Sequence, residues 1–237
     1  MSRRFQSSNS KRILRAPQNL ASQKRFRHGA ALSQRTRGLE KNQKCPFAPP
    51  EDWYESEGTE GTDYRIIVQD PGPEYSHVVT PDDIRARLAQ LPPAMLEPLE
   101  VVQLSRMTRK KRSFPCYGMQ WGSTLYLYPI ETSLVEYYGR PPRPAERTEA
   151  IMFGGRWVHS HEDDWQLIWT KKAVKDFYLN NILIHELGHL LDDRNSSYTD
   201  RERYAEWFAI EHGYRKSKRL GRRARSPKNV RRRHHAK

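Results

Sequence analysis

The chain has 237 residues, a formal net charge of +14 and a hydrophobic content of 36%. It contains no run of about eighteen apolar residues, and no apolar core follows its basic N-terminal cluster, so the sequence predicts neither a transmembrane span nor a secretory signal. Cys45 and Cys116 are too few for a disulfide framework and are expected to be free thiols. These features exclude membrane-embedded and disulfide-stabilised classes and indicate a soluble, cytoplasmic protein.

The positive charge is concentrated at the two ends of the chain. Residues 1–44 hold twelve Lys or Arg against one acid, residues 215–237 hold twelve and no acid, and the remainder therefore has a net charge of −9. Both ends are poor in bulky apolar residues, which predicts disorder. We expect basic tails at 1–47 and 215–237, flanking a single domain at 48–214.

The tails admit several functions. They could bind nucleic acid or another polyanion nonspecifically, because clustered Arg and Lys neutralise phosphates. They could also solubilise the ends, dock on an acidic partner or a membrane surface, or mask the acidic domain. The N-terminal tail has the composition of a mitochondrial transit peptide, which leaves mitochondrial targeting as an alternative location.

The first half of the domain reads as a mixture of strands and one helix. Thr80-Pro81-Asp82-Asp83 is a helix start, with a cap, an early proline and acids in the first turn. Arg109–Arg112 is expected to be an exposed basic loop. The expected strands are Tyr64–Val68, Leu99–Leu104 and Thr124–Tyr128, with turns at Tyr117-Gly118 and Trp121-Gly122.

A predicted hairpin follows, formed by Ile151–His159 and Trp165–Thr170. His159 and His161 lie near its turn, where histidines are usually ordinary surface residues. Two helical segments come after the hairpin. The order of strands, hairpin and helices predicts an α+β fold with a small mixed sheet and an edge hairpin, packed on the first of these helices.

The first of these helices, Lys175–Asp193, contains His185-Glu186-Leu187-Gly188-His189. An HExxH spacing places two imidazoles one helical turn apart, so that both can bind one zinc ion with the glutamate beside it. Two satisfied core histidines would explain neither the glutamate nor the spacing. Apolar residues recur at intervals of three and four, as in a buried amphipathic helix: Val174, Tyr178, Ile182, Leu183, Leu187, Leu190 and Leu191.

A catalytic zinc usually has three protein ligands, and the second helix supplies a candidate for the third. This helix is expected to begin near Asp200, with Thr199 or Asp200 as its cap. Glu206 lies among small and aromatic residues on the face expected to pack, where a carboxylate is costly unless it is paired or metal-bound. Glu206 is therefore the predicted third ligand. Glu202 is the alternative, although it could simply pair with neighbouring arginines.

The segments HELGHLLDD and RYAEWFAIEHG resemble the gluzincin metallopeptidases, and most closely the lethal-factor type of catalytic domain, over about residues 178–213. The resemblance implies a minimal zincin-like domain with one zinc ion per chain. By position, it implies His185, His189 and Glu206 as the zinc ligands and Glu186 as the general base.

The resemblance also concerns the surroundings of the site. The family has a substrate-side tyrosine where this chain has Thr199, so that the neighbouring Tyr198 is the implied oxyanion-stabilising residue. Asp192 and Asp193 match paired aspartates, which could hydrogen-bond a ligand histidine, cap the helix or lie in solvent. Gluzincins hold peptide along an edge strand, and either arm of the predicted hairpin could be that strand.

The predicted function is a zinc-dependent metallopeptidase acting on a protein or peptide substrate. Zinc would lower the pKa of its water to about 7, and Glu186 would take the proton and return it to the leaving amine. Two histidines and one carboxylate could also hold Fe(II), although HExxH favours zinc. The alternative is a nucleic-acid-associated protein with basic tails and a structural or vestigial HExxH helix.

Overall fold

The computed structural model describes residue 50 and residues 64–113, 116–161 and 164–219. The two predicted tails therefore lie mostly outside the described residues. The strands are β1 (Arg65–Val68), β2 (Tyr75–Ser76), β3 (Val101–Leu104), β4 (Gly118–Trp121), β5 (Thr124–Leu127), β6 (Ile130–Glu131), β7 (Val135–Tyr138), β8 (Arg156–His161) and β9 (Asp164–Ile168). The helices are α2 (Pro81–Leu88), η3 (Pro93–Met95), α3 (Arg109–Ser113), α4 (Pro144–Met152), α5 (Lys171–Phe177), η4 (Tyr178–Ile182), α6 (Leu183–Leu191), α7 (Tyr198–Phe208) and η5 (Ala209–Tyr214).

The main sheet has the order β1-β3-β5-β4, with β1, β3 and β5 parallel and β4 antiparallel at one edge. Every residue of β3 and β5 is buried, as expected of parallel strands covered on both faces. A tight turn joins β4 to β5, with Gly122 at a φ of +55°. The predicted strands at Tyr64–Val68, Leu99–Leu104 and Thr124–Tyr128 are confirmed, and the chain is an α+β protein.

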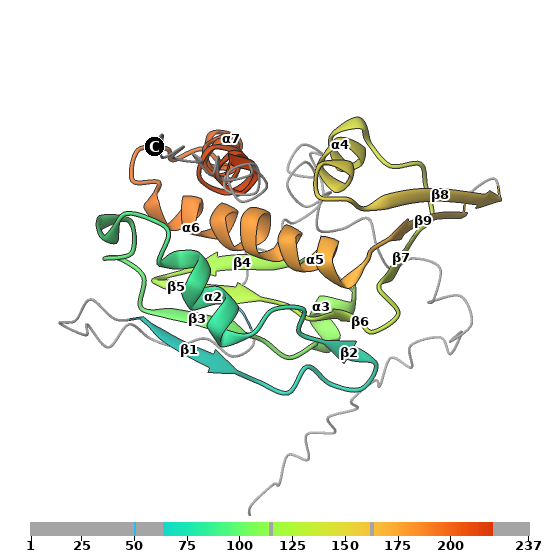
Figure 1. Ribbon diagram of the computed structural model, residues 1–237, viewed down its shortest axis with the longest axis horizontal. Helices are drawn as coiled ribbons and strands as arrows, with labels where there is room; N and C mark the ends of the chain where they lie inside the picture. Colours follow the sequence, from blue (N-terminus) through green and yellow to red (C-terminus); the bar gives the residue numbers. More distant parts are fainter. Residues whose placement is uncertain (1–49, 51–63, 114–115, 162–163, 220–237) are drawn as a thin grey trace, which may run out of the picture.

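A second sheet projects from the main body beside α4 (Figure 1). It has the order β7-β9-β8, all antiparallel, and contains the predicted hairpin as β8 and β9. The prediction that this hairpin forms the edge of the sheet under the HExxH helix is wrong. The first predicted arm was also too long, because Ile151 and Met152 end α4 and the strand begins at Arg156.

Helices cover the main sheet on the side where the HExxH segment lies (Figure 1). The predicted start of α2 is confirmed, since Thr80 accepts a hydrogen bond from the backbone N–H of Asp83 and the Asp83 carboxylate accepts one from Thr80 N–H. One long helical segment runs through α5, the π-helical η4 and α6, and α7 packs across α6. Arg87 of α2 donates to the Asn180 side chain and to the His212 carbonyl, which joins η4 to η5.

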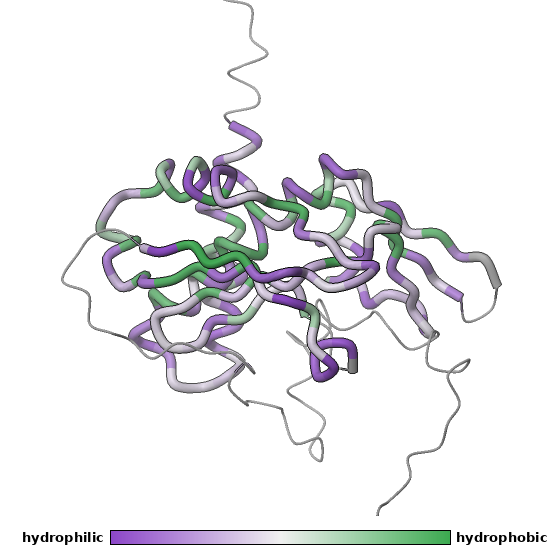
Figure 2. Tube along the Cα trace, turned by 90° about the horizontal axis from the view of Figure 1, so that it is seen from below, coloured by the Kyte–Doolittle hydropathy of each residue, from purple (hydrophilic) through white to green (hydrophobic). Residues whose placement is uncertain are grey.

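The core lies between the main sheet and these helices. Its fully buried side chains include Leu125 and Leu127 of β5 and Phe177, Tyr178 and Leu183 of the α5–α6 segment. Figure 2 shows apolar residues concentrated in the strands at the middle of the molecule. Among the described helices, none combines the length and the apolar character that crossing a bilayer requires.

Three further segments differ from their predictions. The residues 109–112 form the short helix α3 rather than an exposed loop, and Lys111 within it is only 9% exposed. The predicted turn at Tyr117-Gly118 is instead the start of β4. Residues 215–219, assigned by composition to the C-terminal tail, continue the helix beyond η5, and Lys218 there contacts Asp176 at 3.3 Å.

Candidate metal site

The two histidines of the HExxH segment lie on one face of α6. Their ring centroids are 4.7 Å apart, as expected for residues separated by four positions in a helix. His185 and Glu186 are buried, and His189 is partly exposed. The apolar residues before and between the histidines, such as Leu183 and Leu187, are buried in the core. The predicted buried helix is therefore confirmed.

The carboxylate that reaches the two histidines belongs to Glu202. Its Oε1 lies 3.2 Å from His189 Nε2, and its Oε2 lies 3.7 Å from His185 Nε2. Within the described part of the chain, His185, His189 and Glu202 form the one group of three such side chains close enough to hold a metal ion. Glu206, the predicted third ligand, lies one turn further along α7 and is exposed. The structure thus groups Glu202, the alternative third ligand, with the two histidines, and places Glu206 outside this group.

The spacing of the three side chains is compatible with one shared metal ion. One ligand atom of each residue lies within 4.8 Å of the ligand atoms of the other two. Glu202 Oε2 is buried and has no hydrogen-bond partner among the described residues. A buried carboxylate oxygen without a partner is costly, and a bound cation would remove that cost.

The electrostatics of Glu202 follow from its surroundings. Burial raises the pKa of a carboxyl group, but the interactions with the His185 and His189 imidazoles outweigh burial and lower the pKa of Glu202 to about 2. Glu202 is thus a carboxylate at neutral pH. A divalent cation between this carboxylate and two imidazole nitrogens would find two neutral donors and one negative charge, a donor set typical of zinc hydrolases.

Close packing of the two helices sets the position of Glu202. A Cβ atom at Gly188 would lie 3.0 Å from the Ala205 Cα atom and 3.1 Å from the Phe208 Cβ atom. The glycine of HExxH therefore lets α7 approach α6 closely. Arg201 adds a polar contact, donating from its guanidinium to the His189 carbonyl at the end of α6 over 3.2 Å. This hydrogen bond ties the residue next to Glu202 to the second histidine.

Glu186 lies where α6 meets the edge strand β4. It is 7% exposed, and a Cβ atom at Gly118 would lie 2.9 Å from both its Cγ and its Oε1. The same Cβ atom would lie 2.7 Å from the Ile182 side chain. The start of β4 can therefore lie against the carboxyl group of Glu186 only because residue 118 has no side chain. The strand beside the candidate base is β4, and not either arm of the β8–β9 hairpin.

Tyr198 and the two aspartates lie near the site without joining the ligand group. Tyr198 is the first residue of α7 and is half-buried, one helical turn before Glu202 and hence on the same side of the helix. Asp192 Oδ1 accepts hydrogen bonds from the backbone N–H groups of Arg194 and Asn195, so it organises the turn between α6 and α7. Asp193 is exposed, with 88% of its side chain accessible.

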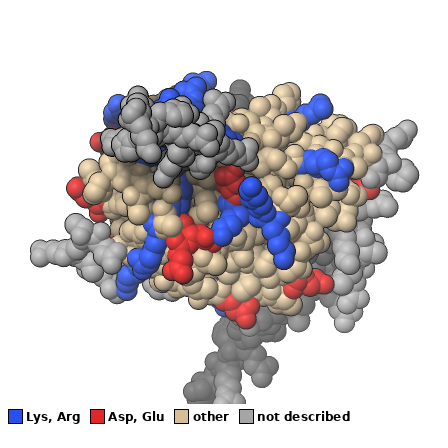
Figure 3. Space-filling model, in the orientation of Figure 1, with Lys and Arg blue, Asp and Glu red and all other residues tan. Residues whose placement is uncertain are grey.

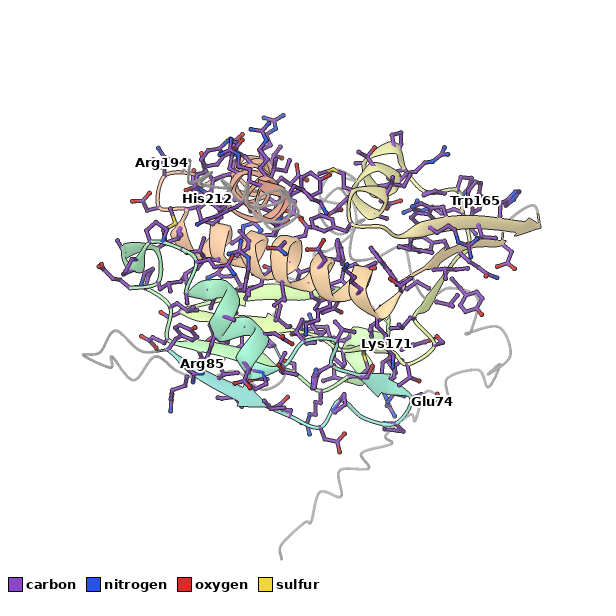
Figure 4. The ribbon with its side chains drawn as sticks, viewed as in Figure 1. Glu74, Arg85, Trp165, Lys171, Arg194 and His212 are labelled. Atoms are coloured by element: carbon purple, nitrogen blue, oxygen red, sulfur yellow. The ribbon has the colours of Figure 1, made fainter. Side chains whose placement is uncertain are left out.

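The turn between the two ligand helices is remote from the projecting sheet. In Figure 4, Arg194 at this turn and Trp165 on β9 lie at opposite ends of the long α5–α6 segment. On the same side of the molecule, acidic and basic side chains are interspersed (Figure 3). The described residues of that face therefore form no broad patch of one sign.

From the sequence, Glu202 is only the alternative third ligand, and Gly118 is not identified as part of the site. Glu202 lies two residues after Asp200, in the second turn of α7. The predicted helix start, near Asp200, was two residues late, because Ser197 and not Thr199 or Asp200 is the cap. The role of Gly118 was hidden because Tyr117-Gly118 was interpreted as a turn. A glycine inside an apolar run can equally mark a strand against which another backbone or side chain packs closely.

Comparisons with family models, curated proteins and solved structures give no match to this chain.

Proposed function

We propose that this chain is a metal-dependent peptidase in which His185, His189 and Glu202 hold a zinc ion. The observation on which the proposal depends is the meeting of three ligand side chains from two helices, with Glu202 Oε1 at 3.2 Å from His189 Nε2 and a buried, unpartnered Oε2 facing His185. When bound, zinc would polarise a carbonyl group and lower the pKa of a water molecule to about 7.

Glu186 is the proposed general base. It lies next to His185 in the chain and is buried beside β4, where the lack of a side chain at Gly118 leaves room for its carboxyl group. In this position it takes a proton from the attacking water and returns it to the amine that leaves. Tyr198 remains a proposed oxyanion-stabilising residue, supported by its place on the ligand side of α7 one turn before Glu202.

The proposed substrate is an extended peptide segment paired with β4. This strand ends the order β1-β3-β5-β4, and the edge of a sheet offers backbone groups for addition of a further strand. A peptide on β4 would run past Gly118 and hence past the Glu186 carboxyl group. Side-chain specificity would come from alternate residues of the peptide, because neighbouring side chains of a strand point to opposite faces.

Metal content of the purified full-length chain tests the ligand set. We expect about one zinc per chain in the wild type and in Glu206→Ala, and loss of zinc in His185→Ala and Glu202→Ala. Glu206→Ala is the matched control, since it removes the same group from the same helix one turn away. A folded wild type without stoichiometric metal would contradict the proposal and favour the nucleic-acid-associated alternative. Loss of metal in Glu206→Ala with metal retained in Glu202→Ala would contradict the proposed ligand set and make Glu206 the third ligand.

Activity is tested on a mixture of unstructured peptides, with cleavage products identified by mass spectrometry. Zinc-loaded wild type should cut peptide bonds, and Glu186→Gln should retain zinc while losing about 10²- to 10⁴-fold in rate, the contribution typical of a general acid–base group. If the zinc-loaded wild type cleaves nothing, the site binds metal for another purpose. If Glu186→Gln cleaves as fast as wild type, Glu186 is not the base.

A further inference from the structure

A notch outside the candidate metal site lies at the carboxyl ends of the three parallel strands. Its lining includes Gln69, Ser105 and Tyr128, the residues that directly follow β1, β3 and β5. It measures about 260 Å³ including its solvent-open mouth, and the enclosed part takes a single water-sized group. In open sheets with parallel strands, the crevice at these ends is where ligands commonly bind.

The innermost cation of the notch is Lys111, from α3. Its ammonium group lies 3.0 Å from Cys116 Sγ, 4.0 Å from Met119 Sδ and 4.2 Å from the centre of the Tyr128 ring. No described carboxylate lies within ion-pair distance of it, although the side chain is only 9% exposed. Sulfur atoms and an aromatic face are weak partners for a buried ammonium, which ordinarily pairs with an anion.

Hydrogen-bond donors and further cations surround this ammonium group. Ser105 is buried and its hydroxyl oxygen accepts from Gln103 Nε2 at 3.0 Å, which leaves the hydroxyl hydrogen to donate elsewhere. Thr108, Arg106, Lys110 and Pro50 also line the notch. None of the described residues in its lining is acidic. The notch thus combines one desolvated positive charge, a hydroxyl donor and two cations at its mouth.

We propose that this notch binds a tetrahedral oxyanion, a phosphate group, with one oxygen seated on the Lys111 ammonium and the Ser105 hydroxyl. The remaining oxygens face the mouth, where Arg106 and Lys110 neutralise them. Charge-assisted hydrogen bonds of this kind are stronger than neutral ones. The phosphate comes either free from solution or as the ester of a nucleotide, and the open mouth admits both. The inference is independent of the proposed peptidase function.

The test uses the full chain with Cys45 replaced by serine, so that Cys116 is its one thiol. Sodium phosphate is titrated at constant ionic strength against sodium chloride, and the alkylation rate of Cys116 and the thermal midpoint are followed. We expect a saturable, several-fold fall in the alkylation rate, because phosphate draws the Lys111 ammonium away from the sulfur and covers the notch. The midpoint should rise over the same concentration range.

Lys111→Met should abolish both saturable effects, because it keeps the aliphatic stem and removes the charge. Arg112→Gln is the matched control, an exposed cation of the same helix outside the notch, and should retain both. A nucleoside monophosphate in place of inorganic phosphate distinguishes the sources: tighter binding of the nucleotide supports an ester, and equal or weaker binding supports the free ion. Should Lys111→Met fail to fold, the Cys116 readout decides alone. Stabilisation without protection of Cys116, or no saturable effect at all, would overturn the proposal.

Discussion

Glu202 and Glu136 are both buried glutamates, yet their environments shift their pKa values in opposite directions. Glu202 lies between two imidazoles, and its pKa is lowered to about 2. Glu136, on β7, lies among core residues and accepts hydrogen bonds from the Tyr117 hydroxyl and the Trp169 indole N–H, each at 2.6 Å. Burial raises the pKa of Glu136 to about 7, because its two neutral donors compensate desolvation only in part.

The opposite pKa shifts of the two glutamates follow from the chemistry of their partner side chains. Imidazoles can take up a proton or share a cation with the carboxylate, so Glu202 is stable as an anion that faces other ligands. The Tyr117 phenol and the Trp169 indole donate hydrogen bonds to Glu136 but carry no positive charge. Glu136 therefore links β7 to residues just before β4 and α5, and among the described residues it is not grouped with other metal-ligand side chains. Burial of an acid is therefore a poor sign of a functional site, and the chemistry of its partners is the informative feature.

Removal of metal gives the largest expected contrast between the two glutamates. In the wild type and in Glu136→Gln, a chelator should lower the midpoint of thermal unfolding. A metal ion that binds only the folded state stabilises that state, and the chelator removes the ion. Glu202→Gln should lose at least about 100-fold in zinc affinity, more than the loss typical of residues that merely support a ligand. Its midpoint should then be unaffected by chelator. Calorimetry with and without chelator measures this.

An equal chelator effect in all three proteins would show that metal binds elsewhere, for example at histidines outside the described residues. A chelator effect that disappears in Glu136→Gln but persists in Glu202→Gln would reverse the roles assigned to the two acids.

Stability as a function of pH tests Glu136 itself. A carboxyl group whose pKa is higher in the folded than in the unfolded chain stabilises the fold below about pH 4.5, and that stability is lost as the pH rises towards about 7. At most about 3 kcal/mol is expected from this group. Glutamine mimics the protonated form, so Glu136→Gln should abolish this part of the pH dependence. Urea unfolding at pH 5 and pH 8, with chelator present, measures the difference.

Burial lowers the pKa values of His77 and His212. Both histidines are common to the two proteins, so their contributions to the pH dependence cancel in the comparison. Identical pH profiles of wild type and Glu136→Gln would show that the buried carboxyl is compensated fully by Tyr117 and Trp169.

The part of the site that lies on one helix could be predicted from the sequence, because it depends only on the spacing of residues close in the chain. His185, Glu186 and His189 are placed relative to one another by the geometry of one helix, which the apolar periodicity around them already predicts. The capped helix α2 and the apolar strands β3 and β5 were predictable for the same reason, since each depends on residues close in the chain. The α+β class followed from their order.

The third ligand could not be fixed in this way. Whether Glu202 or Glu206 reaches the histidines depends on how α7 crosses α6, and that crossing is set by contacts of Gly188 with Ala205 and Phe208. The proximity of Gly118 to Glu186 could not be predicted either, because it depends on the pairing of β4 with β5 in the sheet. Glu206 was predicted on the packing face, but Ala205 and Phe208 form that face and Glu206 is exposed.

Gly188→Ala changes the surroundings of Glu202 and leaves those of Glu136 intact. The added methyl group meets the Ala205 backbone at 3.0 Å, so α7 has to move away from α6 by a few tenths of an ångström. Overpacking of this kind costs about 1–3 kcal/mol, offset by about 1 kcal/mol of improved helix propensity. We expect a net destabilisation of about 1 kcal/mol and a several-fold weaker zinc affinity, measured by urea unfolding with chelator and by competition with a zinc indicator.

Unchanged zinc affinity in Gly188→Ala would mean that the helices adjust without displacing Glu202, and that the close approach serves packing alone. The pH dependence assigned to Glu136 should be the same as in the wild type, which is the internal control.

The smallest effect is expected from the cap of α7. Ser197 Oγ accepts from the Asp200 backbone N–H at 3.1 Å, and Thr80 makes the equivalent bond at the start of α2, to Asp83 at 3.2 Å. Ser197→Ala and Thr80→Ala should each cost about 1 kcal/mol of stability. Only Ser197→Ala should also weaken zinc binding, because fraying of the first turn of α7 reaches Glu202, whereas α2 contributes no ligand. Equal zinc affinities in the two variants would show that packing against α6 alone holds Glu202 in place.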